Sequence, residues 1–189
     1  MILPIVAYGA PVLRKKAAAI DKDYKGLDAL IENMYETMYH AQGVGLAAPQ
    51  VGKPVRIFVI DADPFSEDEA QLEGFKKVFI NPEMIEEEGE EWAFSEGCLS
   101  IPEVREDVSR KPKIKLRYQD ENFETHEEEF DGLAARVIQH EYDHLEGVLF
   151  TDLIPAIRKT MIKGKLNQIA KGKIKSDYPM SFYDNKRKR

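Results

Sequence analysis

Apolar residues recur at steps of three and four between Asp131 and Gly147, which predicts one amphipathic helix over this stretch. Asp131 stands where a side chain can cap the first turn, and Gly147 stands where the left-handed residue that ends many helices is expected. The apolar stripe comprises Leu133, Ala134, Val137, Ile138 and Leu145. The opposite side, which we expect to face solvent, comprises Ala135, Arg136, Gln139, Tyr142 and Asp143.

The remaining pattern predicts two further helices and a set of strands. One helix is expected from about Asp23 to Gly43, and another within Thr151 to Ala170. Strands are expected at residues 55–60, 77–80, 113–118 and 122–130, the last two as a hairpin, whereas the charged residues 83–91 are expected at a solvated strand edge or turn. Because no helical pattern separates these strands, the sequence predicts an α+β fold. Mainly antiparallel sheets would pack around the central helix, with an N-terminal and a C-terminal helix beside them.

The central helix carries a pair of histidines, His140 and His144. At a spacing of four they project together from the edge of the apolar stripe and can occupy adjacent corners of one metal tetrahedron. Glu141 falls near the middle of the stripe, where an unpaired carboxylate is costly to bury unless something charged or protic lies beside it. The pattern therefore indicates a metal site; the alternative is a helix with two ordinary surface histidines.

Composition narrows the class of protein. A chain of 189 residues fits a single domain, which we place at residues 1–170. Its one cysteine, Cys98, rules out an intrachain disulfide and fits a reducing compartment. The N-terminal apolar run has no basic region ahead of it, and no later segment approaches the length of a membrane span. We therefore expect a soluble, cytoplasmic protein.

Charge is distributed unevenly along the chain. The formal net charge of -7 combines residues 151–189, with 11 basic and three acidic residues, and the remainder, with 16 basic and 31 acidic residues. We interpret residues 171–189 as a basic C-terminal tail that could contact a polyanion such as the ribosome. The alternative is a solvated, partly disordered end from Asp177 to Arg189. The acidic connector, residues 61–73, lacks an apolar period and is expected to be a surface excursion.

A catalytic metal site of this type needs a third protein ligand and one open position for water. Downstream of the helix, Phe150 stands where the metzincin pattern has its third histidine, and Asp152 is the only nearby acid. Upstream, the choices are His40, His126 and Cys98. Cys98 is favoured because a thiolate is a strong ligand for a borderline-soft divalent ion, and two histidines plus one cysteine leave one corner free.

A glycine-containing segment covers residues 43–50. Its small residues match a relaxed dinucleotide-binding fingerprint, but that motif needs a strand before it and a helix after it. Here a helix precedes the segment and Pro49 blocks a following helix, so we reject the nucleotide-binding interpretation. The glycines instead allow the backbone to approach a ligand, and Gln50 supplies an amide that can donate a hydrogen bond. A simple tight turn would use the same residues.

Three segments together resemble the peptide deformylase family: Gly43-Val44-Gly45-Leu46-Ala47-Ala48-Pro49-Gln50, Glu96-Gly97-Cys98-Leu99-Ser100 and Gln139-His140-Glu141-Tyr142-Asp143-His144-Leu145-Glu146-Gly147. They occur in the family's order and at family-like separations, and the likeness extends from the amino terminus to about Asp152. The resemblance implies an enzyme that removes the formyl group from the initiator methionine of new polypeptides and releases formate. It says little about residues 61–73 or about the extension past Ala170.

The resemblance also implies roles for individual residues. One divalent metal ion per chain would be held by Cys98, His140 and His144. Glu141 would act as general acid and base, while Gln50 and the Leu99 N–H would face the oxyanion. Family members use Fe(II) in cells and accept zinc, nickel or cobalt in its place.

A substrate pocket and a supporting ion pair complete the expected site. Glu96 is expected to pair with Arg110 and so to steady the cysteine segment. The slot for the methionine side chain is expected to be lined by Val44, Gly45, Leu133 and Val137. Arg136 is left out of the site because the helical pattern directs it outward.

Two alternatives stay open on the sequence alone. An endopeptidase could use the same helix. A ribosome- or RNA-binding module could instead hold a structural metal, with His126 as its fourth protein ligand.

Overall fold

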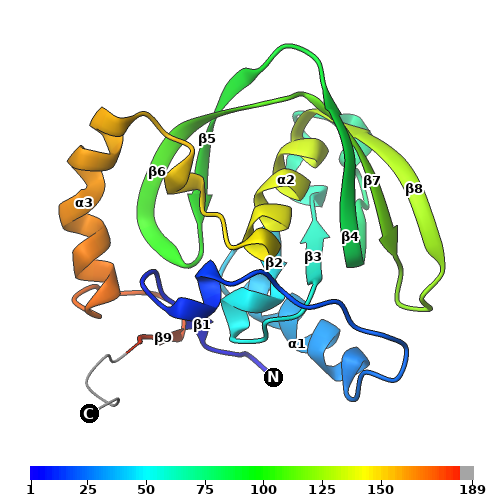
Figure 1. The fold of residues 1–189 in the computed structure, drawn as a ribbon, viewed down its shortest axis with the longest axis horizontal. Helices are drawn as coiled ribbons and strands as arrows, with labels where there is room; N and C mark the ends of the chain where they lie inside the picture. The colour runs from blue at the N-terminus through cyan, green and yellow to red at the C-terminus, as the bar shows by residue number, and fades with distance from the viewer. Residues whose placement is uncertain (184–189) are drawn as a thin grey trace.

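The computed structural model describes residues 1–183, in which two α-helices and nine strands are arranged around a third, central helix (Figure 1). The helices are α1 (Leu27–His40), α2 (Gly132–Glu146) and α3 (Ala156–Ala170). The strands are β1 (Ile5–Val6), β2 (Gly45–Ala47), β3 (Ile57–Asp61), β4 (Lys76–Glu88), β5 (Trp92–Cys98), β6 (Ile101–Arg110), β7 (Lys113–Gln119), β8 (Thr125–Asp131) and β9 (Met180–Ser181). None of the helices in the described part of the chain is long and apolar enough to cross a membrane.

Three sheets organise the strands. The largest is antiparallel and has the order β2-β3-β4-β7-β8, the β5–β6 hairpin is a second antiparallel sheet, and β1 pairs in parallel with β9. Helix α2 lies between the five-stranded sheet and the β5–β6 hairpin, α1 lies by β2 and β3, and α3 lies outside β6 (Figure 1). The predicted α+β fold, with mainly antiparallel sheets around the central helix, is confirmed.

Strand β3 is buried on both faces, which explains its unbroken apolar sequence. Ile57 and Val59 pack into the cluster formed with α1, whereas Phe58 and Ile60 pack into the cluster formed with α2. Successive side chains of a strand point to opposite faces, so one strand serves two cores. The five-stranded sheet therefore holds α2 on one face and α1 on the other.

Strand β4 is longer than predicted. The sequence predicted an end at Asn81 and Pro82, but pairing with β7 continues to Glu88 after a register shift between Ile80 and Glu83. A bulge accommodates a proline, which has no N–H to give to the ladder. Asn81 adopts a positive φ of 49° there. The charged residues 83–88 are thus a paired and mostly exposed part of β4, as the predicted solvated strand edge requires, and not a turn.

Helix α2 is buried on nearly all sides. Its apolar stripe packs on the sheet as predicted, and Gly147 ends it in the left-handed conformation, with φ of 75°. The prediction of a solvent-facing opposite side is wrong for Ala135, Arg136 and Gln139, which are buried. The β5–β6 hairpin and the residue after it cover that side and accept hydrogen bonds from Arg136 and Gln139 through backbone carbonyls.

The first turn of α2 is not capped by the side chain expected there. Asp131 occupies the cap position without a side-chain hydrogen bond. The carboxylate of Glu69 accepts a hydrogen bond from the Leu133 N–H instead, at 3.1 and 3.2 Å from its two oxygens. A negative charge is favourable at a helix amino terminus. The acidic connector is therefore tied to the central helix.

The end of the described chain packs against the domain. Residues 180–181 form β9 beside β1, so the N- and C-terminal segments lie side by side (Figure 1). The Tyr178 hydroxyl donates to the carbonyl of Leu99 at 2.8 Å. Tyr178, Met180 and Tyr183 are half-buried, whereas Pro179, Ser181 and Phe182 are exposed, so the expected solvated end from Asp177 packs in part against the domain. Its last six residues, 184–189, lie outside the described part of the chain.

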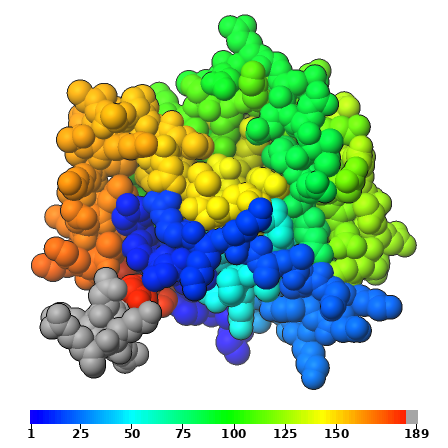
Figure 2. Space-filling view, in the orientation of Figure 1, coloured from blue at the N-terminus to red at the C-terminus, as the bar shows by residue number. Residues whose placement is uncertain are grey.

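The amino-terminal segment covers the carboxyl end of α2. Figure 2 shows this segment, in blue, against the yellow surface of α2. The Ala17 N–H donates to the carbonyl of Leu145 at 2.8 Å, and a Cβ on Gly147 would meet the carbonyl oxygen of Arg14 at 2.6 Å. Glycine at this position thus serves both the turn and the close contact.

Candidate active site

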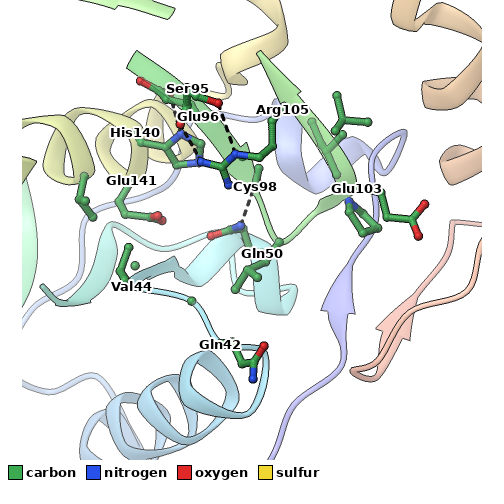
Figure 3. A pocket seen from close by; sticks show the side chains of 18 of the residues that line it. Gln42, Val44, Gln50, Ser95, Glu96, Cys98, Glu103, Arg105, His140 and Glu141 are labelled. Carbon is green, nitrogen blue, oxygen red and sulfur yellow. Dashed lines mark hydrogen bonds and ion pairs between the residues drawn. The ribbon is translucent and has the colours of Figure 1, made fainter. Parts of the chain in front are cut away.

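A cavity of about 580 Å³ opens beside α2 (Figure 3). Its walls come from the loop and strand at residues 42–45, from residues 94–105 of the β5–β6 hairpin, from α2 and from residues 175–178. Gln50, Cys98, His140 and Glu141 all line it. The three segments that the sequence singled out thus meet at one place, although Gln50 and Glu141 lie 91 positions apart along the chain.

Two of the lining residues, Cys98 and His140, form with His144 a group that could hold a metal ion. One ligand atom from each lies within 4.8 Å of the other two. The Cys98 sulfur lies 3.3 Å from Nε2 of His144. His140 and His144 come from successive turns of α2, and Cys98 ends β5, so a helix and a hairpin fix the group from two sides.

The group fits a borderline-soft divalent ion. One thiolate and two imidazoles are ligands of the kind that zinc and iron take, and three protein ligands leave a position open. Nδ1 of His140 forms a hydrogen bond with Oε2 of Glu96, at 3.0 Å. The other ring nitrogen of His140 is therefore left for an ion. Burial lowers the pKa of His144 well below its usual value, so that ring keeps a free lone pair.

Glu141 is a buried carboxylate beside this group. Within residues 1–183 its Oε2 has no hydrogen-bond partner. Burial raises the pKa of Glu141 to about 7. A Cβ on Gly45 would meet Oε1 of Glu141 at 2.6 Å, so only glycine leaves room for the carboxylate. The helical pattern predicts that Glu141 points inward, and the structure confirms this direction.

The amide of Gln50 is oriented by its neighbours. Its oxygen accepts the Ala47 N–H at 2.8 Å, so its nitrogen points toward the Cys98 sulfur, at 3.4 Å, and toward the Ser100 hydroxyl, also at 3.4 Å. Gln50 is 1% exposed. The donor end of the amide is therefore held in the cavity, next to Cys98 (Figure 3).

Glu96 is the centre of a buried network that supports the histidine. It forms the expected ion pair with Arg110, with Nε and Oε1 2.7 Å apart, and a second pair with Arg136 at 3.0 Å. Arg110 also pairs with Asp143 at 2.7 Å. Although burial disfavours the charged form, hydrogen bonds from His140 and Arg110 hold the pKa of Glu96 well below its usual range. The carboxylate thus stays ionised.

Sequence reasoning missed several residues at the site. The helical pattern places Arg136 outside the site, yet the arginine is buried, binds Glu96 and lines the cavity. Val44, Gly45 and Val137 line the cavity as expected for a pocket, but Leu133 does not: it packs in the core one turn before Val137. Other lining residues had no local sequence signal: Phe65, Phe94, Lys175, Ser176, Asp177 and Tyr178.

His126 lies elsewhere. Its Nε2 is 2.8 Å from Asp120, near the β7–β8 turn, where a separate group of three possible ligands includes Glu124. In the described chain, no fourth cysteine, histidine or acid joins the Cys98 group. A structural metal enclosed by four protein ligands, with His126 as the fourth, is thereby contradicted.

Comparison with known proteins gives consistent matches. The family model described as polypeptide deformylase matches residues 2–160. The peptide deformylase of Christiangramia forsetii is 63% identical over 196 residues, covering all of both chains, and that of Flavobacterium psychrophilum is 62% identical, covering 99% of this chain and all of the other. The crystal structure of peptide deformylase from Thermotoga maritima superposes with a TM-score of 0.74 at 45% identity, over 82% of this chain and 99% of that one.

The fold, the Cys-His-His group and the neighbouring buried carboxylate define a metal-dependent hydrolase. When bound, a metal ion in such a site can polarise a carbonyl group for attack by water. More narrowly, the chain belongs to the peptide deformylase family, and its reaction is removal of the formyl group from the N-terminal methionine of polypeptides.

Proposed function

We propose that Cys98, His140 and His144 hold a single divalent ion, Fe(II) in cells, and that the purified protein accepts zinc, nickel or cobalt in its place. The observation that carries this proposal is the convergence of one sulfur and two imidazoles within 4.8 Å, beside a buried carboxylate. When bound, such an ion supplies Lewis acidity and can lower the pKa of water to about 7. The endopeptidase alternative finds no support in the relatives from Christiangramia forsetii, Flavobacterium psychrophilum and Flavobacterium johnsoniae, each of which is named peptide deformylase.

Glu141 is the group that moves protons in this proposal. Its carboxylate takes a proton from the attacking water and returns it to the departing amine, so that formate and a free amino terminus result. A general acid and base works best with a pKa near the working pH, and burial raises the pKa of Glu141 to about 7. Gly45 keeps the space beside the carboxylate open.

Gln50 and Leu99 stabilise the developing negative charge. The Gln50 amide nitrogen is held in the cavity by the bond that its oxygen accepts from Ala47. The Leu99 N–H supplies the second donor, and the hydroxyl of Tyr178 restrains the same residue through its carbonyl. Loss of one such donor typically costs about 10²- to 10³-fold in rate.

A paired assay tests the proposed activity and separates it from endopeptidase activity. The protein is incubated with formyl-Met-Ala and, separately, with casein, before and after treatment with a chelator. We expect formate from formyl-Met-Ala, no cleavage of casein, loss of formate release on chelation and its return when Fe(II) is added under anaerobic conditions. Cleavage of casein, or formate release that a chelator leaves unchanged, would contradict the proposal.

We further propose a cytoplasmic location and contact with the ribosome, where formylated chains emerge. The hydrolase domain spans residues 1–170, and residues 184–189 carry four basic residues and one acidic residue. Residues 178–183 contact the domain, and three basic residues before them, Lys171, Lys173 and Lys175, are exposed. Charge-driven binding to RNA weakens steeply with salt.

Deletion of residues 184–189 tests the contact with the ribosome. We expect less co-sedimentation with ribosomes at low salt for the shortened chain, and little binding of either chain at high salt. Formate release from formyl-Met-Ala is expected to stay unchanged and serves as the control for folding. Equal co-sedimentation of both chains at low salt would show that residues 184–189 do not make the contact.

A further inference from the structure

The acidic connector contributes an aromatic side chain to the cavity. Phe65 belongs to a short 3-10 turn, Asp63–Phe65, within this connector. It is half-buried, lines the cavity and packs against the hydrophobic cluster that surrounds α2. A segment whose sequence predicted a surface excursion thus reaches the site.

Four cavity-lining residues also belong to or pack on that cluster: Val44, Phe65, Phe94 and Val137. Each of the four thus meets both the cavity and the cluster, which gives the cavity an apolar end on the side of that cluster. This end lies next to Glu141. Val137 precedes Glu141 by one helical turn, and a Cβ on Gly45, the residue after Val44, would meet the Glu141 carboxylate. An apolar side chain seated there would therefore sit beside the reacting group.

A chain of contacts fixes Phe65 relative to α2. The Glu69 N–H donates to the carbonyl of Phe65 at 2.9 Å, and the Glu69 carboxylate accepts the Leu133 N–H at the start of α2. A Cβ on Gly132 would lie 2.5 Å from the same carboxylate, so the fit is close. Glu69 thus ties the connector to the helix that carries His140 and Glu141.

We propose that Phe65 determines specificity for the first residue of the substrate, and that Glu69 is the positioning residue that holds Phe65 against α2. The inference rests on the proposed activity of the cavity, since it assigns the methionine side chain to the apolar end. Phe65 closes that end from the connector side, which favours a slender, unbranched side chain over an aromatic one. Removing its ring widens the apolar end.

The first test measures discrimination between two substrates. The ratio of kcat/KM for formyl-Met-Ala to that for formyl-Phe-Ala is determined for the wild type, Phe65→Ala and Phe65→Leu. We expect the ratio to fall by about tenfold or more in Phe65→Ala and by less in Phe65→Leu. The matched control is Phe75→Ala, because Phe75 follows the same connector and packs on Phe130 but is not among the cavity-lining residues. Its ratio is expected to equal that of the wild type.

The second test examines Glu69. Glu69→Ala removes the acceptor for the Leu133 N–H and is expected to lower the ratio about threefold or more. Glu69→Gln keeps an acceptor oxygen and is expected to restore the ratio to the wild-type value. Glu73→Ala removes an exposed acid of the same connector and serves as the control.

The outcomes separate the inference from the activity on which it rests. If the wild type releases formate but the ratio in folded Phe65→Ala stays within about twofold of the wild-type ratio, the role of Phe65 is overturned. Should Phe65→Ala not fold, an unchanged ratio in Phe65→Leu overturns it in the same way. An unchanged ratio in Glu69→Ala overturns the role of Glu69. Absence of formate release by the wild type would instead remove the proposed activity itself.

Discussion

Replacement of Glu141 by glutamine is expected to lower kcat by about 10²- to 10⁴-fold, because the amide cannot take a proton from water or return it to the amine. The metal content should stay at the wild-type level, since Glu141 is not one of the three proposed ligands. The midpoint of thermal unfolding should stay equal or rise, because a buried carboxylate whose Oε2 has no partner in the described chain is costly to fold around. Formate release, elemental analysis and a thermal melt measure the three quantities.

Glu146→Gln is the matched control for this prediction. Glu146 lies on the same helix, but its carboxylate pairs with Arg56 at 2.6 Å and with Lys16 at 3.1 Å, away from the cavity. Its replacement is expected to leave kcat unchanged. A Glu141→Gln variant that keeps its metal and turns over within tenfold of the wild type would show that proton transfer uses another group.

Replacement of Glu96 by alanine is expected to destabilise the protein by about 3–5 kcal/mol, because it leaves Arg110 and Arg136 buried without their common partner. The same carboxylate binds Nδ1 of His140 and so orients that ring. Loss of such a partner typically lowers metal affinity by about 10- to 100-fold. Urea unfolding and a competitive metal titration measure the two effects.

Glu106→Ala tests whether the effect is specific to the network around Glu96. Glu106 is also buried and also pairs with an arginine, Arg158, at 2.7 Å. The Arg158 side chain is 46% exposed, so water can solvate it when its partner is removed. We expect a loss of about 1 kcal/mol or less and unchanged metal affinity. Equal losses in both variants would contradict a special role for Glu96.

The parts of the site that could be predicted from sequence are those fixed by local spacing. His140, Glu141 and His144 lie within two turns of one helix, so the helical repeat alone sets their directions. Cys98 could be selected because the chain offers few other soft ligands. The direction of Glu141 followed from the same repeat.

The opposite side of α2 could not be predicted, because non-local structure covers it. Arg136 points away from the apolar stripe as the repeat requires, but the β5–β6 hairpin lies over that side. The sequence gives little indication of this hairpin, because its inward positions include Glu106 and Arg110. These charged residues interrupt the alternation of apolar and polar residues that is typical of a strand. Partners distant in sequence make these charges tolerable in the interior.

Phe65 and Tyr178 were missed for a related reason. Each lies in a polar stretch without an apolar repeat, so nothing in its neighbourhood predicts burial. Phe65 reaches the cavity because Glu69 binds the start of α2, and Tyr178 reaches Leu99 beside the parallel pair of β9 with β1. Tertiary contacts of this kind override local pattern.

The central claim is that Cys98, His140 and His144 together hold one metal ion that formyl removal requires. The most direct test is elemental analysis of anaerobically purified wild-type protein and of Cys98→Ala, paired with formate release from formyl-Met-Ala and with circular dichroism to verify folding. We expect about one ion per chain and rapid formate release for the wild type, and loss of both for folded Cys98→Ala. A folded Cys98→Ala variant that keeps its ion and its turnover would contradict the account.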